Sequence, residues 1–256
     1  MRVLLTNDDG YQSAGLQQLC RALSSSYEVY VAAPAQQQSG ASHSMHGFQK
    51  IFVEPVAIPG AEKAWAVSGT PVDSVKIGIE KLLKVPVDCV ISGINQGANL
   101  GTDVFYSGTV GAACEAAIGG IPALAVSLDT HNKNADYQAA VQVASQVLQQ
   151  LLAQAPAVDV PFLMNLNIPE LPLKEIKGIR AAQLGVRRYH NKLAEQFDED
   201  GRLAFLLGGI CEELSGRKDD DVQLVKQGYA SLTPLSLNRT DFHQMPFCRR
   251  ITGENL

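Results

Sequence analysis

The chain has 256 residues, of which 46% are hydrophobic, 18% charged and 6% aromatic. This composition excludes a disordered protein, a disulfide-rich mini-protein and a coiled coil, and the length allows one large domain with or without a smaller extension. The formal charge of −5 and the isoelectric point near 5.5 provide no strongly basic footprint. We therefore expect no nucleic acid polymer as a partner.

Cysteine usage and hydropathy indicate a cytoplasmic protein. The five cysteines include no C-x-x-C pair, and an odd number at wide spacing favours reduced thiols over a disulfide framework. Only a short apolar run, Val3 to Leu5, precedes the polar Asn7, so we expect no secretory signal. No stretch approaches the roughly 18 apolar residues that a membrane span needs, so we expect no membrane partner.

The first two thirds of the chain alternate between short apolar runs and segments of helical period. This alternation is typical of βα units that build a parallel sheet. A Thr-Pro pair at Thr70 and Pro71 predicts a helix start, because Thr caps helices well and Pro suits the first helical position. Strands are expected at 2–6, 28–33, 64–67, 87–92, 123–127 and 162–168, and helices around 16–23, after 70, from about 107, and over 135–152.

Beyond about Pro172 the pattern changes to β-like runs. A hairpin turn is indicated at 198–201, between Leu193 and Phe205. We therefore predict an α/β core over residues 1–171 and a β-rich extension, continuous with it, over 172–256. The three aspartates at 219–221 are interpreted as a solvated loop.

Ligands of open parallel sheets bind beyond the carboxyl ends of the strands, where this sequence places oxygen-bearing side chains. Asp8 and Asp9 follow the first strand, Ser39 lies in the polar segment after the second, and Asn95 lies in a Gly- and Asn-rich segment, 93–101, that predicts turns rather than regular structure.

Adjacent carboxylates repel one another unless a cation or protons compensate them. Oxygen donors alone favour Mg²⁺ or Mn²⁺ over a thiolate zinc site. The alternative is that Asp8 and Asp9 are turn and capping residues before the first helix.

A second candidate site lies at Ser107, Gly108 and Thr109, which open an amphipathic segment. A helix start of this kind offers free N–H groups, two hydroxyls and the positive end of the helix dipole, which suits a phosphate. An ordinary serine cap is the alternative. Together with nearby carboxylates, the segment indicates metal-assisted phosphoester hydrolysis.

Several other chemistries lack their motifs. The sequence contains no P-loop, no G-x-S-x-G and no G-x-G-x-x-G after the first strand. Gly10 stands where an aspartyl-phosphate phosphatase has its second Asp, so that mechanism is not supported. His43 and His46 lie in the polar segment near the proposed site, and we interpret them as exposed loop residues.

A series of motifs in order along the chain resembles the SurE survival-protein nucleotidases. The matching stretches are 2–10 (RVLLTNDDG), 33–34 with 39–42, 68–73 (SGTPVD), 92–101 (SGINQGANLG), 103–113 (DVFYSGTVGAA), 120–127, 165–169 (NLNIP) and 228–235. The tail departs from many bacterial members, because Asn238 replaces an Asp and His243 is displaced by about one position. The segment from His43 to Lys50 also fits the family pattern poorly.

The resemblance implies a Rossmann-like three-layer core with a mostly parallel sheet, and a C-terminal β-extension used to form a homodimer or homotetramer. It implies a metal-dependent 5′-nucleotidase that hydrolyses nucleoside 5′- and 3′-monophosphates, and short polyphosphate as well. One Mg²⁺ or Mn²⁺ per subunit is expected on Asp8, Asp9, Ser39 and Asn95, and the phosphate on Asn95, Ser107, Gly108 and Thr109.

Asp8 or Asp9 is expected to orient the attacking water and act as the catalytic base. A non-catalytic nucleotide or polyphosphate sensor and a hydrolase of a non-nucleotide phosphoester are the alternative functions.

Overall fold

A computed structural model describes residues 1–154, 161–214 and 217–253, with the backbone alone for 191–193 and 206–210. Its centre is a nine-stranded sheet in the order β3-β4-β2-β1-β5-β6-β7-β11-β8. The strands are β1 (Arg2–Thr6), β2 (Glu28–Pro34), β3 (Val53–Val56), β4 (Lys63–Val67), β5 (Cys89–Gln96), β6 (Ala123–Asp129), β7 (Leu163–Pro169), β8 (Ile179–Ala181) and β11 (Ala230–Pro234). The run from β4 to β7 is parallel, whereas β3 and β11 pair antiparallel to β4 and β7.

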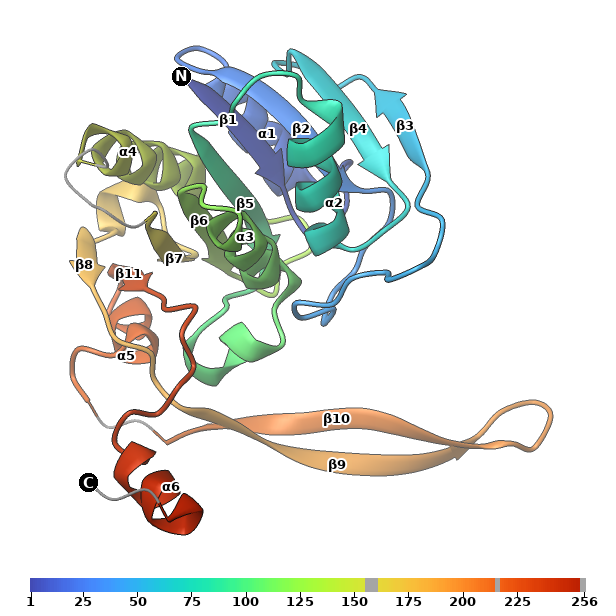
Figure 1. Cartoon of the computed structure of the whole chain (residues 1–256), viewed down its shortest axis with the longest axis vertical. Helices are drawn as coiled ribbons and strands as arrows, with labels where there is room; N and C mark the ends of the chain where they lie inside the picture. The colour runs from blue at the N-terminus through green and yellow to red at the C-terminus, as the bar shows by residue number, and fades with distance from the viewer. Residues whose placement is uncertain (155–160, 215–216, 254–256) are drawn as a thin grey trace.

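Helices cover both faces of the sheet (Figure 1). On one face, α1 (Ala14–Leu23) and α4 (Gln138–Gln154) contribute Leu16, Leu19 and Leu148 to the larger apolar core. On the other, α2 (Pro71–Ile77) and α3 (Gly108–Ile118) enclose a second core with Val75, Val110 and several alanines. The predicted three-layer α/β fold with a mostly parallel sheet is confirmed.

The expected starts of two helices are confirmed in detail. Thr70 accepts a hydrogen bond from the Asp73 N–H, and the Asp73 carboxylate accepts one from the Thr70 N–H, which forms a capping box at α2. The Ser107 hydroxyl caps α3 by accepting from the Val110 N–H at 3.0 Å. A π-helical turn, Gly78–Leu82, continues α2, and 3₁₀ turns occur at Gly101–Phe105 and Leu173–Glu175.

The prediction for segment 93–101 is wrong in its first half. Strand β5 continues through Gly93 to Gln96, where its pairing with β6 shifts register between Ser92 and Asn95. Gly93 has a positive φ angle of 144° and lies where the register shifts, so it bends the strand rather than ending it. Gly97, with a φ angle of 114°, follows the last residue of the strand. The short edge strand β3 was not predicted, because Pro55 interrupts its β pattern.

The C-terminal third contains the predicted hairpin and two unpredicted helices. Strands β9 (Arg187–Phe197) and β10 (Leu203–Glu213) pair along their whole length and project away from the core (Figure 1). Strands β8 and β11 instead extend the main sheet. The additional helices are α5 (Asp221–Lys226) and α6 (Met245–Thr252).

The interpretation of 219–221 as a solvated loop is wrong for two of its three residues. Asp220 and Asp221 are fully buried. Asp220 caps α5 by accepting from the Gln223 N–H, and Asp221 accepts from the N–H groups of Gly101 and Gly185, both at 2.8 Å. Buried carboxylates of this kind satisfy backbone donors that would otherwise be unpaired.

Among the described residues, every helix is too short or too polar to cross a membrane.

Candidate active site

The candidate site lies where the strand order reverses direction. The chain moves from β1 to β2 and β4 on one side and later to β5, β6 and β7 on the other, which leaves a crevice at the carboxyl ends of β1 and β5. A cavity of about 900 Å³ occupies this crevice. Its lining includes residues from both halves of the chain, namely Asp8, Ser39, Gly40, Asn95, Gln96, Gly97, Ala98, Asn99, Thr102, Asp103, Phe105, Tyr106, Ser107, Val186, Arg187, Arg188 and Tyr189.

Asp8 is the most buried acidic group of the cavity wall, with 4% of its surface exposed. Its Oδ1 accepts a hydrogen bond of 2.6 Å from the Thr109 hydroxyl, which joins the end of β1 to the start of α3. Burial raises the pKa of Asp8 to about 6; the Thr109 hydrogen bond opposes the rise and the charge of Asp9 adds to it. A carboxylate in this position is stabilised by a cation.

Asp9 is joined to the Ser39 segment by a glutamine. The Gln37 Nε2 lies 3.3 Å from Asp9 Oδ1 and 2.9 Å from the Ser39 Oγ. The Gln96 N–H donates to Asp9 Oδ2 at 3.0 Å, which ties the carboxylate to the end of β5. Burial raises the pKa of Asp9, and the hydrogen bonds from Gln96 and Gln37 oppose the rise.

Strand β7 fixes the loop that follows β5. The Asn99 N–H donates to Asn167 Oδ1 at 2.7 Å, and the Asn165 amide donates to the Asn99 carbonyl at 2.8 Å. All three asparagines are buried. Asn95 donates through its amide to the Gly97 carbonyl at 2.8 Å, so its Oδ1 remains available to the cavity. The 165–169 motif therefore has a structural role in shaping the cavity wall.

The close packing of α3 on Asp8 requires Gly108. A Cβ at this position would lie 2.9 Å from the Asp8 Cβ and 3.0 Å from its Oδ2. The Asp8 Oδ1 is held by the Thr109 hydroxyl, and Oδ2 is the carboxylate oxygen that lies against Gly108. The absence of a side chain at Gly108 therefore leaves one carboxylate oxygen open toward the cavity.

The donor set fits a hard divalent cation. Among the described residues, no three His, Cys, Asp or Glu side chains gather as a metal cluster. The candidate set has only two carboxylates, Asp8 and Asp9, and the Ser39 hydroxyl and Asn95 amide oxygen would complete it. Neutral and anionic oxygens together suit Mg²⁺ or Mn²⁺, which retain several water ligands in protein sites.

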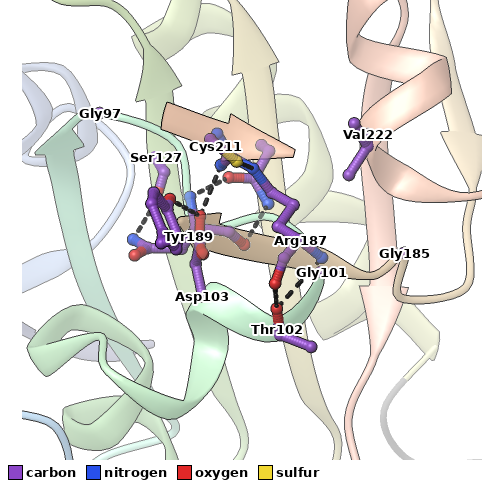
Figure 2. A network of polar contacts seen from close by, with 12 residues as sticks. Gly97, Gly101, Thr102, Asp103, Ser127, Gly185, Arg187, Tyr189, Cys211 and Val222 are labelled. Atoms are coloured by element: carbon purple, nitrogen blue, oxygen red, sulfur yellow. Dashed lines mark hydrogen bonds and ion pairs between the residues drawn. The ribbon is translucent and has the colours of Figure 1, made fainter. Parts of the chain in front are cut away.

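The opposite wall of the cavity comes from the root of the β9–β10 hairpin. Arg187 forms an ion pair of 2.5 Å with Asp103, and the Tyr189 hydroxyl donates to the same carboxylate oxygen at 3.0 Å (Figure 2). The Arg187 N–H donates to Thr102 Oγ1 at 3.1 Å. Burial raises the pKa of Asp103, and Arg187 and Tyr189 oppose the rise. Arg187, Arg188 and Tyr189 thus line the same cavity as Asp8 and Ser107.

The predicted site residues lie together: Asp8, Ser39, Asn95 and Ser107 line the cavity, Thr109 and Gly108 contact Asp8, and Gln37 joins Asp9 to Ser39. Three further lining residues, Arg187, Arg188 and Tyr189, were not predicted from the sequence. An Arg-Arg-Tyr run at the start of a predicted strand was the available signal, but nothing in the sequence indicated that this strand begins beside Thr102 and Asp103.

Comparison with known proteins agrees with this architecture. The family described as Survival protein SurE matches residues 3–191. A 5′-nucleotidase SurE from Syntrophomonas wolfei subsp. wolfei is 44% identical over 95% of this chain and 91% of its own length, and one from Symbiobacterium thermophilum is 41% identical over 97% of both. The crystal structure of the SurE protein from Aquifex aeolicus superposes with a TM-score of 0.84 and 32% identity, covering 98% of this chain and all of that one. The chain therefore belongs to the SurE family.

Proposed function

We propose that the chain is a metal-dependent 5′-nucleotidase that hydrolyses nucleoside 5′- and 3′-monophosphates to nucleoside and phosphate, with short polyphosphate as a further substrate. The observation that carries the proposal is the contact between Asp8 and the start of α3, where Thr109 donates to the carboxylate and Gly108 leaves its second oxygen open. This contact supports a cation site at Asp8 next to an anion site at the start of α3. The curated relatives named 5′-nucleotidase support the substrate class.

In this proposal Asp8, Asp9, Ser39 and Asn95 hold one Mg²⁺ or Mn²⁺ per subunit. When bound to these oxygens, a divalent cation would supply charge neutralisation for the phosphate and a lower pKa for a bound water. The phosphate binds to the Ser107 hydroxyl, the Asn95 amide and the first N–H groups of α3 at Gly108 and Thr109. The Thr109 hydroxyl already donates its hydrogen bond to Asp8, so in this proposal it orients the Asp8 carboxylate and does not bind the phosphate.

The reacting groups of the chain then have distinct tasks. One of the two carboxylates, Asp8 or Asp9, orients the attacking water and accepts its proton. The N-terminus of α3 and Ser107 stabilise the charge that develops on the phosphate oxygens in the transition state. Arg188, which lines the same cavity, offers positive charge to the remainder of the nucleotide, whereas the charge of Arg187 is already compensated by Asp103.

The proposal is tested by release of inorganic phosphate from 5′-AMP and 3′-AMP with Mn²⁺, with Mg²⁺ and with EDTA. We expect release that requires the metal and is lost in Asp8→Ala, while Asp200→Asn, in the exposed hairpin turn, behaves as wild type. AMP binding without turnover under any metal would indicate a sensor. Equal turnover of a simple phosphoester such as glycerol phosphate would indicate a hydrolase without nucleotide specificity.

We further propose that residues 172–256 form an extension of the core used to assemble a homodimer or homotetramer, and that the protein works in the cytoplasm. Exposed apolar side chains on the hairpin and α6, such as Phe197, Phe205 and Ile251, support assembly through this part of the chain. The five cysteines are unpaired in the structure, in keeping with a reducing compartment. Sedimentation velocity of Phe197→Ser with Phe205→Ser tests assembly, because loss of these contacts should yield the monomer.

A further inference from the structure

The segment that carries Ser39 is held in place by several contacts on its C-terminal side. Ser39 itself is exposed and belongs to no helix or strand. The Gln38 N–H donates to the Asp8 carbonyl at 2.7 Å and anchors the N-terminal side. The Ser42 hydroxyl and N–H donate to the carbonyls of Phe105 and Tyr106 at 2.6 and 3.1 Å. The position of the Ser39 oxygen therefore depends on how the following residues are attached.

Asp73 is the first of two carboxylates that attach this segment. Its side chain is 4% exposed, and its oxygens accept from the His46 N–H at 3.1 Å and from the His46 ring Nδ1 at 2.8 Å. The Thr70 hydroxyl donates to the Ser44 carbonyl at 2.7 Å. The 68–73 motif thus has a second task besides capping α2, because its Thr and Asp both bind the segment that follows Ser39.

Glu115 is the second carboxylate, and it lies on α3. It is paired with the His43 Nε2 at 3.0 Å and has 13% of its side chain exposed. The segment approaches α3 so closely that a Cβ on Gly111 would lie 2.5 Å from the Ser42 carbonyl oxygen. His43 and His46 are therefore attached to the two helices that border the active site, contrary to their interpretation as exposed loop residues.

We infer that His43 and His46 are positioning residues that hold Ser39 at the metal site, through Glu115 and Asp73. This inference rests on the proposed metal site. If the segment is detached in some of the molecules, only the remaining molecules present the Ser39 oxygen to the metal. The apparent affinity for the metal is then reduced in proportion to the attached fraction. Both histidines follow Ser39 closely along the chain, so the loss of their hydrogen bonds should displace the Ser39 oxygen.

The test measures Mn²⁺ binding directly, by electron paramagnetic resonance of free Mn²⁺ in titrations of the metal-free full chain. The variant is His43→Ala with His46→Ala, and the rescue variant is His43→Gln with His46→Asn, because the Gln Nε2 and Asn Nδ2 can replace the imidazole nitrogens that donate. The matched control is His190→Ala, which removes an exposed histidine paired with Glu212 on the hairpin. Asp8→Ala serves as the reference for a destroyed metal site.

We expect Mn²⁺ binding about tenfold weaker in the double alanine variant, as the loss of about two ordinary hydrogen bonds implies, and near wild type in the rescue and control variants. At saturating Mn²⁺, kcat should return to within about twofold of wild type, and the melting temperature of the metal-free protein should fall by only a few degrees. Unchanged Mn²⁺ affinity, or a loss that the rescue variant does not restore, would overturn the inference. If wild type shows no Mn²⁺ binding that Asp8→Ala abolishes, the proposed metal site fails instead.

Discussion

Replacing Asp8 by asparagine should stabilise the metal-free protein while it removes activity. Burial raises the pKa of Asp8 from its ordinary value of 3.8 to about 6. Between these two values the folded protein binds more protons than the unfolded chain, so the free energy of unfolding falls as pH rises through the window and stays low above it. At about 1.4 kcal/mol per pH unit, the penalty at pH 8 is about 3 kcal/mol.

The substituted asparagine keeps the shape of the side chain and an oxygen that accepts from Thr109, but it has no charge to bury. In EDTA at pH 8, Asp8→Asn should therefore raise the free energy of unfolding by about 3 kcal/mol, or the melting temperature by roughly 6 to 12 °C for a chain of this length. At pH 4.5, where the folded protein already holds the proton, the gain should shrink to about 1 kcal/mol.

The assay is urea denaturation in EDTA at both pH values, repeated with Mn²⁺. Mn²⁺ should stabilise wild type, because it binds only to the folded state. It should have little effect on Asp8→Asn, because the site in this variant lacks a charged oxygen. Asp200→Asn controls for the change of net charge, since Asp200 is exposed in the hairpin turn. A variant no more stable than wild type at pH 8, or a gain of equal size at both pH values, would refute the reasoning.

Three further substitutions separate the roles of the site and the core. Gly108→Ala should lower kcat at least tenfold and cost about 1 to 3 kcal/mol of stability, because its Cβ would lie 2.9 Å from the Asp8 Cβ and 3.0 Å from Asp8 Oδ2; steady-state kinetics with AMP measures the loss of activity, and wild-type kcat contradicts it. Asp221→Ala should cost about 3 kcal/mol in guanidinium unfolding, since the Gly101 N–H and other buried donors lose their acceptor. Leu148→Ala should cost about 2 to 5 kcal/mol with kcat unchanged, because Leu148 is fully buried on α4, away from the cavity.

Local patterns along the chain were sufficient for much of the fold. Short apolar runs predicted five of the strands within two residues at both ends and the start of β5 within two, and Thr70 and Ser107 predicted the starts of two helices that the structure confirms. These features depend on side chains near one another in sequence, such as a cap and the N–H three residues on. The glycine-rich run after Ser92 is compatible with a turn and with a bent strand. Its prediction as a turn was wrong because pairing with β6 extends β5.

Burial of charged residues could not be read from the sequence. The aspartates 219–221 have the composition of a solvated turn, yet Asp221 is buried because it accepts from Gly101 and Gly185, backbone groups 120 and 36 residues away. The histidines of the polar segment were misinterpreted for the same reason, since Asp73 and Glu115 are brought to them only when α2 and α3 pack side by side.

By itself, the sequence determined which oxygen-bearing residues follow the strands, and the right-handed parallel sheet gathers those residues at one edge. The tertiary structure alone decided what surrounds them. It brings the hairpin root with Arg187 and Tyr189 to the cavity that Asp8 also lines, and it places Gly108 where a side chain would press against the Asp8 carboxylate. These contacts join segments about 80 to 180 residues apart, so they depend on how layers pack and not on any local pattern of residues.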